Sequence, residues 1–241
     1  MRLRPLTVLA VFLFLGHVGF AQTIDTDRIE YRIVDLKKET IQMHWKDAKD
    51  SIIGSLAGLA DIYTTSPEKL LYAVNGGIFE PGQIPTGLYI EAGKSLNPLN
   101  TANGRGNFFL KPNGVFAVFK NNTVAVISTD DFVADDQILF ATQSGPMLLI
   151  DGAFHPAFNK GSENMRIRNG VGILPDGNVI LAKSKEIINF YDFASFFKEM
   201  GCKNALYLDG GISKTYDSVK GQAPSIQEFT VMIAITHKKP Q

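Results

Sequence analysis

Short apolar runs separated by turn-forming residues dominate the chain and predict a protein built mainly from β-strands. Between residues 29 and 45, apolar and polar positions alternate on both sides of Lys37-Lys38-Glu39-Thr40, which predicts a hairpin with one buried face. The remaining predicted strands are short β-rich runs bounded by glycine, proline or asparagine: 71–74, 108–110, 115–119, 124–128, 138–142, 147–150, 170–174, 179–182, 205–208 and 229–236.

Two stretches follow the period of an α-helix instead. One has Ser51 as a possible N-cap and an apolar stripe at Ile52, Leu56, Leu59, Ala60 and Tyr63. The other ends at Gly201 and places on one face Phe190, Phe193, Ala194, Phe197 and Met200. Strands outnumber helices, and no repeat or linker divides the chain. We therefore expect a single α+β domain with a mixed, mostly antiparallel central β-sheet of many short strands and a few packed helices.

The N-terminus has the pattern of a signal peptide. Arg2 and Arg4 precede an apolar run over residues 6–15, and Gly19-Phe20-Ala21 offers small residues at the positions that a signal peptidase reads. The run is about half of the roughly 20 residues that a membrane-spanning helix needs. We expect cleavage after Ala21, so that residues 1–21 are a signal peptide and residues 22–241 form an exported domain, periplasmic or secreted, with no membrane span after cleavage.

Composition narrows the classes of function. The chain has 24 basic and 24 acidic residues, and removal of Arg2 and Arg4 with the signal peptide leaves a formal net charge of −2. No basic field is therefore available for nucleic acid. Cys202 is the single cysteine, which excludes an internal disulfide and a thiolate metal cluster and predicts a buried thiol. The length suits one well-buried domain.

Two predicted strands end on closely similar residues. Tyr72-Ala73-Val74 runs into Asn75-Gly76-Gly77, and Ala205-Leu206-Tyr207-Leu208 runs into Asp209-Gly210-Gly211-Ile212-Ser213. Glycine pairs leave the main chain open to a ligand, and Asp209 adds a carboxylate at a strand end. Each segment alone is equally typical of a tight turn. Their repetition predicts one site built from both strand ends.

A third segment carries hydrogen-bonding groups and a cation. Gln143-Ser144-Gly145-Pro146 is a chain reversal, and Arg168 stands directly before the predicted strand 170–174. An arginine can hold a phosphate through two parallel charge-assisted hydrogen bonds. The alternative is a structural arginine paired with a carboxylate such as Asp209.

Other chemistries find little support. Ser144 lacks the strand-to-helix setting of a nucleophile elbow, and no glycine-rich loop leads into a helix as nucleotide binding requires. Of the four histidines, His155 alone is near the candidate loops, and no histidine pair or Cys-His grouping suggests zinc. We expect no metal site and no cofactor, while leaving open a divalent cation recruited by a phosphate.

Taken in order, these motifs resemble the phosphodiester glycosidase family, which includes exported bacterial members linked to exopolysaccharides. The resemblance covers about residues 71–213 and rests on four segments: Asn75-Gly76-Gly77-Ile78-Phe79, Gln143-Ser144-Gly145-Pro146-Met147-Leu148, Arg168-Asn169-Gly170-Val171-Gly172 and Leu208-Asp209-Gly210-Gly211-Ile212-Ser213. The small bacterial branch also has the helix motif Phe190-Tyr191-Asp192-Phe193-Ala194. Animal members usually have phenylalanine and glycine where this chain has Ile78 and Ile212, so the accepted sugar is expected to differ.

The resemblance implies hydrolysis of a sugar-1-phosphodiester, a sugar-phosphate or phosphodiester-linked glycan, to free sugar and a phosphomonoester. Arg168 would then neutralise the phosphate, Asp209 would activate water or stabilise an oxocarbenium ion, and Glu80 would be the reserve acid. The expected substrate-binding residues are Asn75, Gly76, Gly77, Gln143, Ser144, Gly145, His155, Gly210, Gly211 and Ser213.

Two other functions fit the same residues. Asn, Gln, Arg and Asp side chains also suit an exported carbohydrate-binding protein without turnover. An ordinary glycosidase would instead pair Asp209 with Glu80 or Asp151 and would cleave aryl glycosides that carry no phosphate.

Overall fold

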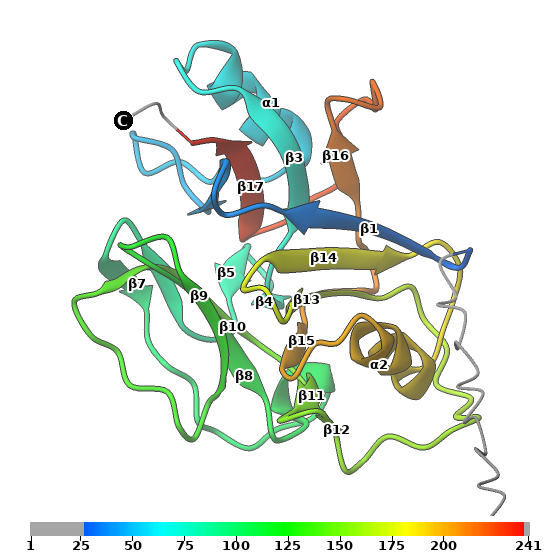
Figure 1. Cartoon of the computed structure of the whole chain (residues 1–241). Helices are drawn as coiled ribbons and strands as arrows, with labels where there is room; N and C mark the ends of the chain where they lie inside the picture. The colour runs from blue at the N-terminus through cyan, green and yellow to red at the C-terminus, as the bar shows by residue number, and fades with distance from the viewer. Residues whose placement is uncertain (1–26, 239–241) are drawn as a thin grey trace, which may run out of the picture.

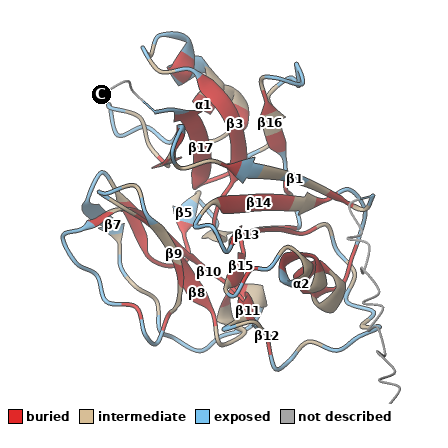
Figure 2. Cartoon of the chain, in the orientation of Figure 1, coloured by how far each residue is buried: buried red, intermediate tan, exposed pale blue. Residues whose placement is uncertain are grey.

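Three antiparallel β-sheets meet around one hydrophobic core in the computed structural model, which describes residues 27–238 (Figure 1). The predicted signal peptide, residues 1–21, lies outside the described residues. Buried residues run along the strands where the sheets face one another, and exposed residues gather in the connecting loops (Figure 2). All strand pairs within the described range are antiparallel, which confirms the predicted α+β class.

The sheets draw on strands that lie far apart in the sequence. The six-stranded sheet has the order β1 (Ile29–Val34), β14 (Val179–Ser184), β13 (Asn169–Ile173), β15 (Ala205–Tyr207), β11 (Met147–Ile150) and β12 (Ala153–Phe154). The five-stranded sheet has the order β7 (Lys94–Asn97), β6 (Tyr89–Glu91), β10 (Ile138–Ser144), β8 (Gly114–Phe119) and β9 (Val124–Ser128). The four-stranded sheet has the order β16 (Thr215–Asp217), β3 (Leu70–Asn75), β17 (Met232–His237) and β2 (Glu39–His44). A small ribbon joins β4 (Phe79–Glu80) to β5 (Ile84–Pro85).

The predicted N-terminal hairpin is wrong in its pairing, although both of its strands exist. β1 pairs with β14 and β2 pairs with β17, in two different sheets. Between them, the amides of Lys38 and Glu39 both donate to the carbonyl of Asp35. This helix-like turn directs the two strands apart instead of folding one back on the other. Periodicity identifies a strand but does not name its partner.

Two further corrections concern local structure. The first helix, α1 (Leu56–Thr64), begins later than predicted, because the side chain of Ser55, not Ser51, caps it by accepting from the amide of Gly58 at 3.1 Å. Residues 108–110, predicted as a strand, overlap instead a single 3-10 turn, η1 (Asn107–Phe109). The strands predicted at 115–119, 124–128, 170–174 and 179–182 are present, and they pair as the hairpins β8–β9 and β13–β14. No helix among the described residues has the length and apolar character to cross a bilayer.

The second helix packs where the sequence places it. α2 (Phe190–Glu199) begins after Asn189, whose side chain accepts from the amide of Asp192 at 2.8 Å, and its apolar face covers the six-stranded sheet. Gly172 of β13 permits this contact, since a Cβ there would lie 2.6 Å from the Phe197 ring and 2.8 Å from Cys202 Sγ. Cys202 is buried, as predicted. The helix thereby fixes the part of the sheet from which Arg168 and Asp209 emerge.

Candidate functional site

The ends of three strands from two sheets meet at one point. Asn75 ends β3 and donates its side-chain amide to the carbonyl of Asp209, 2.7 Å away. Asn169 begins β13 and donates its side-chain amide to the carbonyl of Asn75 at 2.9 Å. The antiparallel pairing of β13 with β15 continues past β15, since the amide of Leu208 donates to the carbonyl of Asn169 at 3.0 Å. The two predicted strand ends and the arginine segment therefore form one cluster.

Asp209 presents a carboxylate that no group of the described residues neutralises. Its backbone carbonyl accepts from Asn75 and, at 2.6 Å, from the hydroxyl of Ser213. No donor from residues 27–238 makes a hydrogen bond or ion pair to its half-buried carboxylate oxygens. Burial raises the pKa of Asp209 from 3.8 to about 6. The side chain is thus fixed through its own backbone, with its oxygens left for other partners.

Arg168 is a buried cation without a counter-charge among residues 27–238. Its side chain is fully buried, and no carboxylate of the described residues lies within ion-pairing distance of it, so the alternative of an Arg168–Asp209 ion pair does not occur. Nε donates to the carbonyl of Ile188 at 2.8 Å and Nη2 to the carbonyl of Asn164 at 2.6 Å, while Nη1 has no hydrogen-bond partner in the part of the chain that the structure describes. The guanidinium lies over the Phe190 ring at 3.5 Å. Burial lowers the pKa of Arg168 to about 10.

Tyr207 links these two charged groups, and sequence reasoning missed it. Its ring lies 5.7 Å from the Arg168 guanidinium, and its hydroxyl accepts from the amide of Gly210 at 2.9 Å. Burial and the nearby Asp209 carboxylate both raise the pKa of Tyr207. A tyrosine within the apolar run 205–208 was the available signal, because a buried hydroxyl next to an acid needs a partner. The sequence predicts Phe190, the platform under Arg168, as a core position of the helix and part of the helix motif, not as a site residue.

The glycines of the two strand ends mainly allow close backbone packing. A Cβ at Gly210 would lie 2.5 Å from both the Cα of Arg168 and the carbonyl of Ile167, and the Gly210 amide already donates to Tyr207. The amide of Gly76 likewise donates to the carbonyl of Val231 at 2.7 Å. In this conformation both amides belong to the fold. A Cβ at Gly211, in contrast, would meet no atom within 4 Å, so its exposed backbone is open to a ligand.

Gln143 and Ser144 use their polar groups inside the protein. The buried Gln143 side chain accepts from the backbone amides of Leu88 and Asn100 at 3.0 and 2.9 Å. It donates to the carbonyl of Asn100 at 2.8 Å and to the hydroxyl of Thr129 at 3.1 Å. Ser144 donates to the carbonyl of Leu208 at 2.8 Å, which ties β10 to the end of β15. At Gly145 a Cβ would lie 2.5 Å from Asn113. These residues brace the cluster, and direct sugar contacts by them would require this bracing to open.

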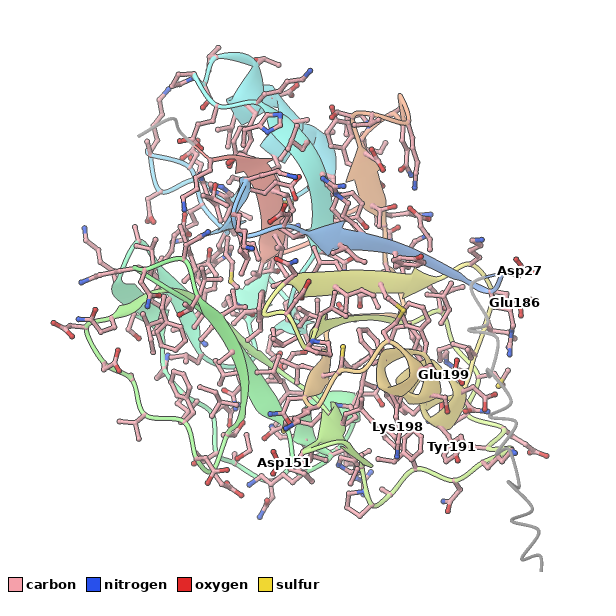
Figure 3. The ribbon with its side chains drawn as sticks, in the orientation of Figure 1. Asp27, Asp151, Glu186, Tyr191, Lys198 and Glu199 are labelled. Carbon is pink, nitrogen blue, oxygen red and sulfur yellow. The ribbon has the colours of Figure 1, made fainter. Side chains whose placement is uncertain are left out.

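The remaining predicted residues make no hydrogen bond or ion pair with Asp209 within residues 27–238. Glu80 is exposed on β4, where it accepts from the Thr86 hydroxyl at 3.2 Å. Asp151 is exposed in the β11–β12 turn (Figure 3). His155 is buried and stacks on Phe158 at 4.8 Å, and Phe158 stacks in turn on Phe190 at 4.9 Å. Two rings therefore separate His155 from the Arg168 guanidinium. Nowhere in residues 27–238 do three His, Cys, Asp or Glu side chains group as a metal site would require.

The raised pKa of Asp209 predicts a stability change with pH. The folded state holds this proton up to about pH 6 and the unfolded state only to about 3.8, so stability declines as pH rises through that window. Asp209→Asn removes the titration, and we expect the variant to gain on the order of 1–3 kcal/mol over wild type near pH 7 but little near pH 4. Urea unfolding at both pH values measures this, with Asp151→Asn as the exposed control. A gain independent of pH would contradict it.

Comparison with known proteins agrees with the motifs at this cluster. The profile of the family described as phosphodiester glycosidase matches residues 68–236, which include all three strand ends. The uncharacterized protein YigE of Escherichia coli (strain K12) is 41% identical over 209 residues, covering 85% of this chain and 80% of that protein. The chain belongs to the phosphodiester glycosidase family.

Solved structures share the fold of this phosphodiester glycosidase family member. The catalytic domain of zebrafish N-acetylglucosamine-1-phosphodiester alpha-N-acetylglucosaminidase, auto-inhibited by its pro-peptide, aligns with a TM-score of 0.57 at 17% identity, over 88% of this chain and 83% of that one. A hypothetical protein from Synechocystis aligns with a TM-score of 0.55 at 13% sequence identity, over 87% of this chain and 59% of that one. A putative exported protein from Burkholderia pseudomallei K96243 aligns with a TM-score of 0.55 at 11% sequence identity, over 86% of this chain and 73% of that one. At these identities the likeness concerns the fold.

Proposed function

We propose that the chain is an exported hydrolase that cleaves a sugar-1-phosphodiester between the anomeric carbon and the phosphate oxygen. Water adds to the sugar, and the products are a free sugar and a phosphomonoester. The observation that carries this proposal is the buried guanidinium of Arg168, which has neither a partner at Nη1 nor a carboxylate partner among residues 27–238, in the same strand-end cluster as Asp209.

An anionic ligand would resolve the electrostatics of Arg168. Burying an unpaired cation costs several kcal/mol even after relaxation, and neutral carbonyls with aromatic faces offset only part of that cost. A phosphate supplies negative charge and accepts from a guanidinium in a bidentate geometry. Since Nη2 donates to the Asn164 carbonyl, we propose that the phosphate replaces this carbonyl when residues 156–167 move aside.

Asp209 is suited to the sugar side of the reaction. With a pKa of about 6 its carboxylate is ionised at neutral pH yet basic enough to accept a proton from water. It would also stabilise positive charge on the anomeric carbon. Because phosphate is a good leaving group once neutralised by Arg168, no second carboxylate is required. Gly211 remains the candidate for an amide donor to the ligand, whereas Gly77 is buried with a Cβ position 2.7 Å from Thr142 Oγ1. Asn75 and Ser213 hold Asp209 in place.

Family membership and the site suggest the substrate class. The zebrafish relative is named for an N-acetylglucosamine-1-phosphodiester, and we propose a phosphodiester-linked sugar or glycan of the cell envelope or of an exopolysaccharide for this chain. Ile212, half-buried beside the Asp209 turn, would narrow the space for the sugar. The signal-peptide pattern at the N-terminus of this chain supports a location outside the cytoplasm, and the Burkholderia structure is named a putative exported protein.

The decisive assay uses the purified chain and the methyl phosphodiester of N-acetylglucosamine-1-phosphate in ¹⁸O-labelled water. We expect release of the sugar, with no label in the methyl phosphate, because the bond at the anomeric carbon breaks. Label in the phosphate would contradict this mechanism. Equal cleavage of a phosphate-free p-nitrophenyl glycoside would favour the two-carboxylate glycosidase, and binding without any product would favour the carbohydrate-binding protein.

A further inference from the structure

A surface pocket of about 330 Å³ lies where helix α2 meets the edge strand β12. Its lining consists of Phe154, Tyr191, Ser195, Lys198 and Glu199. In Figure 3 the side chains of Tyr191 and Lys198 extend from α2 toward the segment that contains β12. None of these residues belongs to the Asp209–Arg168 cluster. The volume falls within the range of pockets that hold small molecules.

Two aromatic rings form the apolar part of the pocket. Phe154 and Tyr191 stack with ring centroids 4.6 Å apart and an interplanar angle of 29°. Both side chains are half-buried, so part of each ring faces solvent. Lys198 Nζ lies 4.6 Å from the Phe154 ring centroid. The pair comes from two different elements, and the backbone of β12 and α2 therefore holds it in place.

The rest of the pocket can donate and accept hydrogen bonds without carrying a net charge. Lys198 supplies a cation and Glu199 an anion, and neither forms an ion pair with the described residues. Ser195 Oγ donates to the carbonyl of Tyr191 at 2.9 Å and can still accept. The Tyr191 hydroxyl makes no hydrogen bond within residues 27–238. An anionic or cationic ligand would meet one like charge here, and a purely apolar one would leave these groups desolvated.

We propose that this pocket binds a pyranose unit of a neutral glycan. A pyranose has an apolar C–H face that fits an aromatic ring and a rim of hydroxyls that both donate and accept. An adjoining hollow of about 260 Å³ shares Ser195 and Glu199 with the pocket. The two together form a path across the outer face of α2 that suits a chain of sugars more than a single residue.

The position of the pocket relates it to the proposed active site. Phe190 supports Arg168 on the inner side of α2, and its neighbour Tyr191 lines the pocket on the outer side. Likewise His155 is buried in the stacked column, while Phe154 precedes it at the surface. A glycan held here would lie on the opposite side of α2 from Arg168. The binding itself rests on the pocket alone, and only its use for a polymeric substrate rests on the proposed function.

Titration with neutral oligosaccharides tests the pocket directly. Maltotetraose, cellotetraose and chitotetraose are added to the full-length mature chain, and binding is followed by saturation-transfer NMR and by calorimetry. We expect at least one of them to bind, and Tyr191→Ala to weaken that affinity at least about tenfold, as removal of an aromatic anchor does. Phe154→Leu should weaken it as well. Tyr216→Ala, which removes a half-buried tyrosine from β16, is the matched control and should leave affinity unchanged.

The outcomes separate this inference from the proposed function. Absence of binding by all three oligosaccharides up to about 10 mM would overturn the pocket, as would affinity that Tyr191→Ala and Phe154→Leu leave unchanged. Thermal unfolding of each variant identifies any that fails to fold, and Tyr191→Phe then tests the hydroxyl with the ring retained. If the wild type binds an oligosaccharide but cleaves no sugar-1-phosphodiester, the proposed function fails and the pocket stands. If it cleaves the phosphodiester but binds none of the oligosaccharides, the pocket fails and the proposed function stands.

Discussion

Replacing Asp209 by asparagine is expected to lower the turnover of a sugar-1-phosphodiester more than about a hundredfold, the usual magnitude for a general acid–base group. Asparagine keeps the shape of the side chain, and the contacts that fix the turn use the backbone of Asp209. The Asn75 and Ser213 hydrogen bonds go to its carbonyl. Activity should therefore fall while the fold and its stability near neutral pH are kept or improved.

Two matched variants control this result. Asp151→Asn and Glu80→Gln make the same chemical change at exposed acids outside the cluster, and both should retain the wild-type rate. Initial rates at saturating substrate measure kcat, and circular dichroism confirms the fold. Equal turnover by wild type and Asp209→Asn would remove Asp209 from the mechanism. A comparable loss in Glu80→Gln would instead support the two-carboxylate alternative.

The sequence predicted the local elements of this fold better than their partners. Alternation and turn residues located most strands, because these signals act over a few neighbouring residues. The pairing of β1 with β14 and of β2 with β17 depends on contacts across most of the chain, which no local pattern encodes. The 3-10 turn at Asn107–Phe109 likewise replaced a predicted strand, since two phenylalanines give a β-like composition in either conformation.

The candidate site shows the same division. The repeated Asx-Gly-Gly endings predicted that the ends of β3 and β15 would lie together. In the structure the Asn75 side chain at the end of β3 donates to the carbonyl of Asp209, which follows β15. The use of each polar group was beyond the sequence. Gln143 was expected to face a sugar, yet its side chain satisfies main-chain groups of Leu88 and Asn100. A composition names the hydrogen bonds a residue can make, whereas only the packed structure decides where they are made.

Replacing Arg168 by lysine is expected to lower kcat/KM for a sugar-1-phosphodiester about tenfold to a hundredfold. Lysine keeps the charge but loses the planar fork that binds two phosphate oxygens, and a hydrogen bond to a charged group contributes about 1.5–3 kcal/mol. The ammonium would also lose the hydrogen bonds that Arg168 makes to Ile188 and Asn164. Inorganic phosphate should raise the melting temperature of wild type, since a ligand that binds the folded state stabilises it. That rise should disappear in the variant.

Arg166→Lys is the control for this prediction, because it makes the same arginine-to-lysine change two residues away, at an exposed side chain. It should keep both the kcat/KM of wild type and the thermal shift with phosphate. The pair separates a specific anion site from a general effect of charge near the loop. If phosphate stabilises Arg168→Lys as much as wild type, the buried guanidinium does not bind the anion. The desolvation cost of its unpaired Nη1 would then be offset by the aromatic rings of Phe190 and Tyr207 alone.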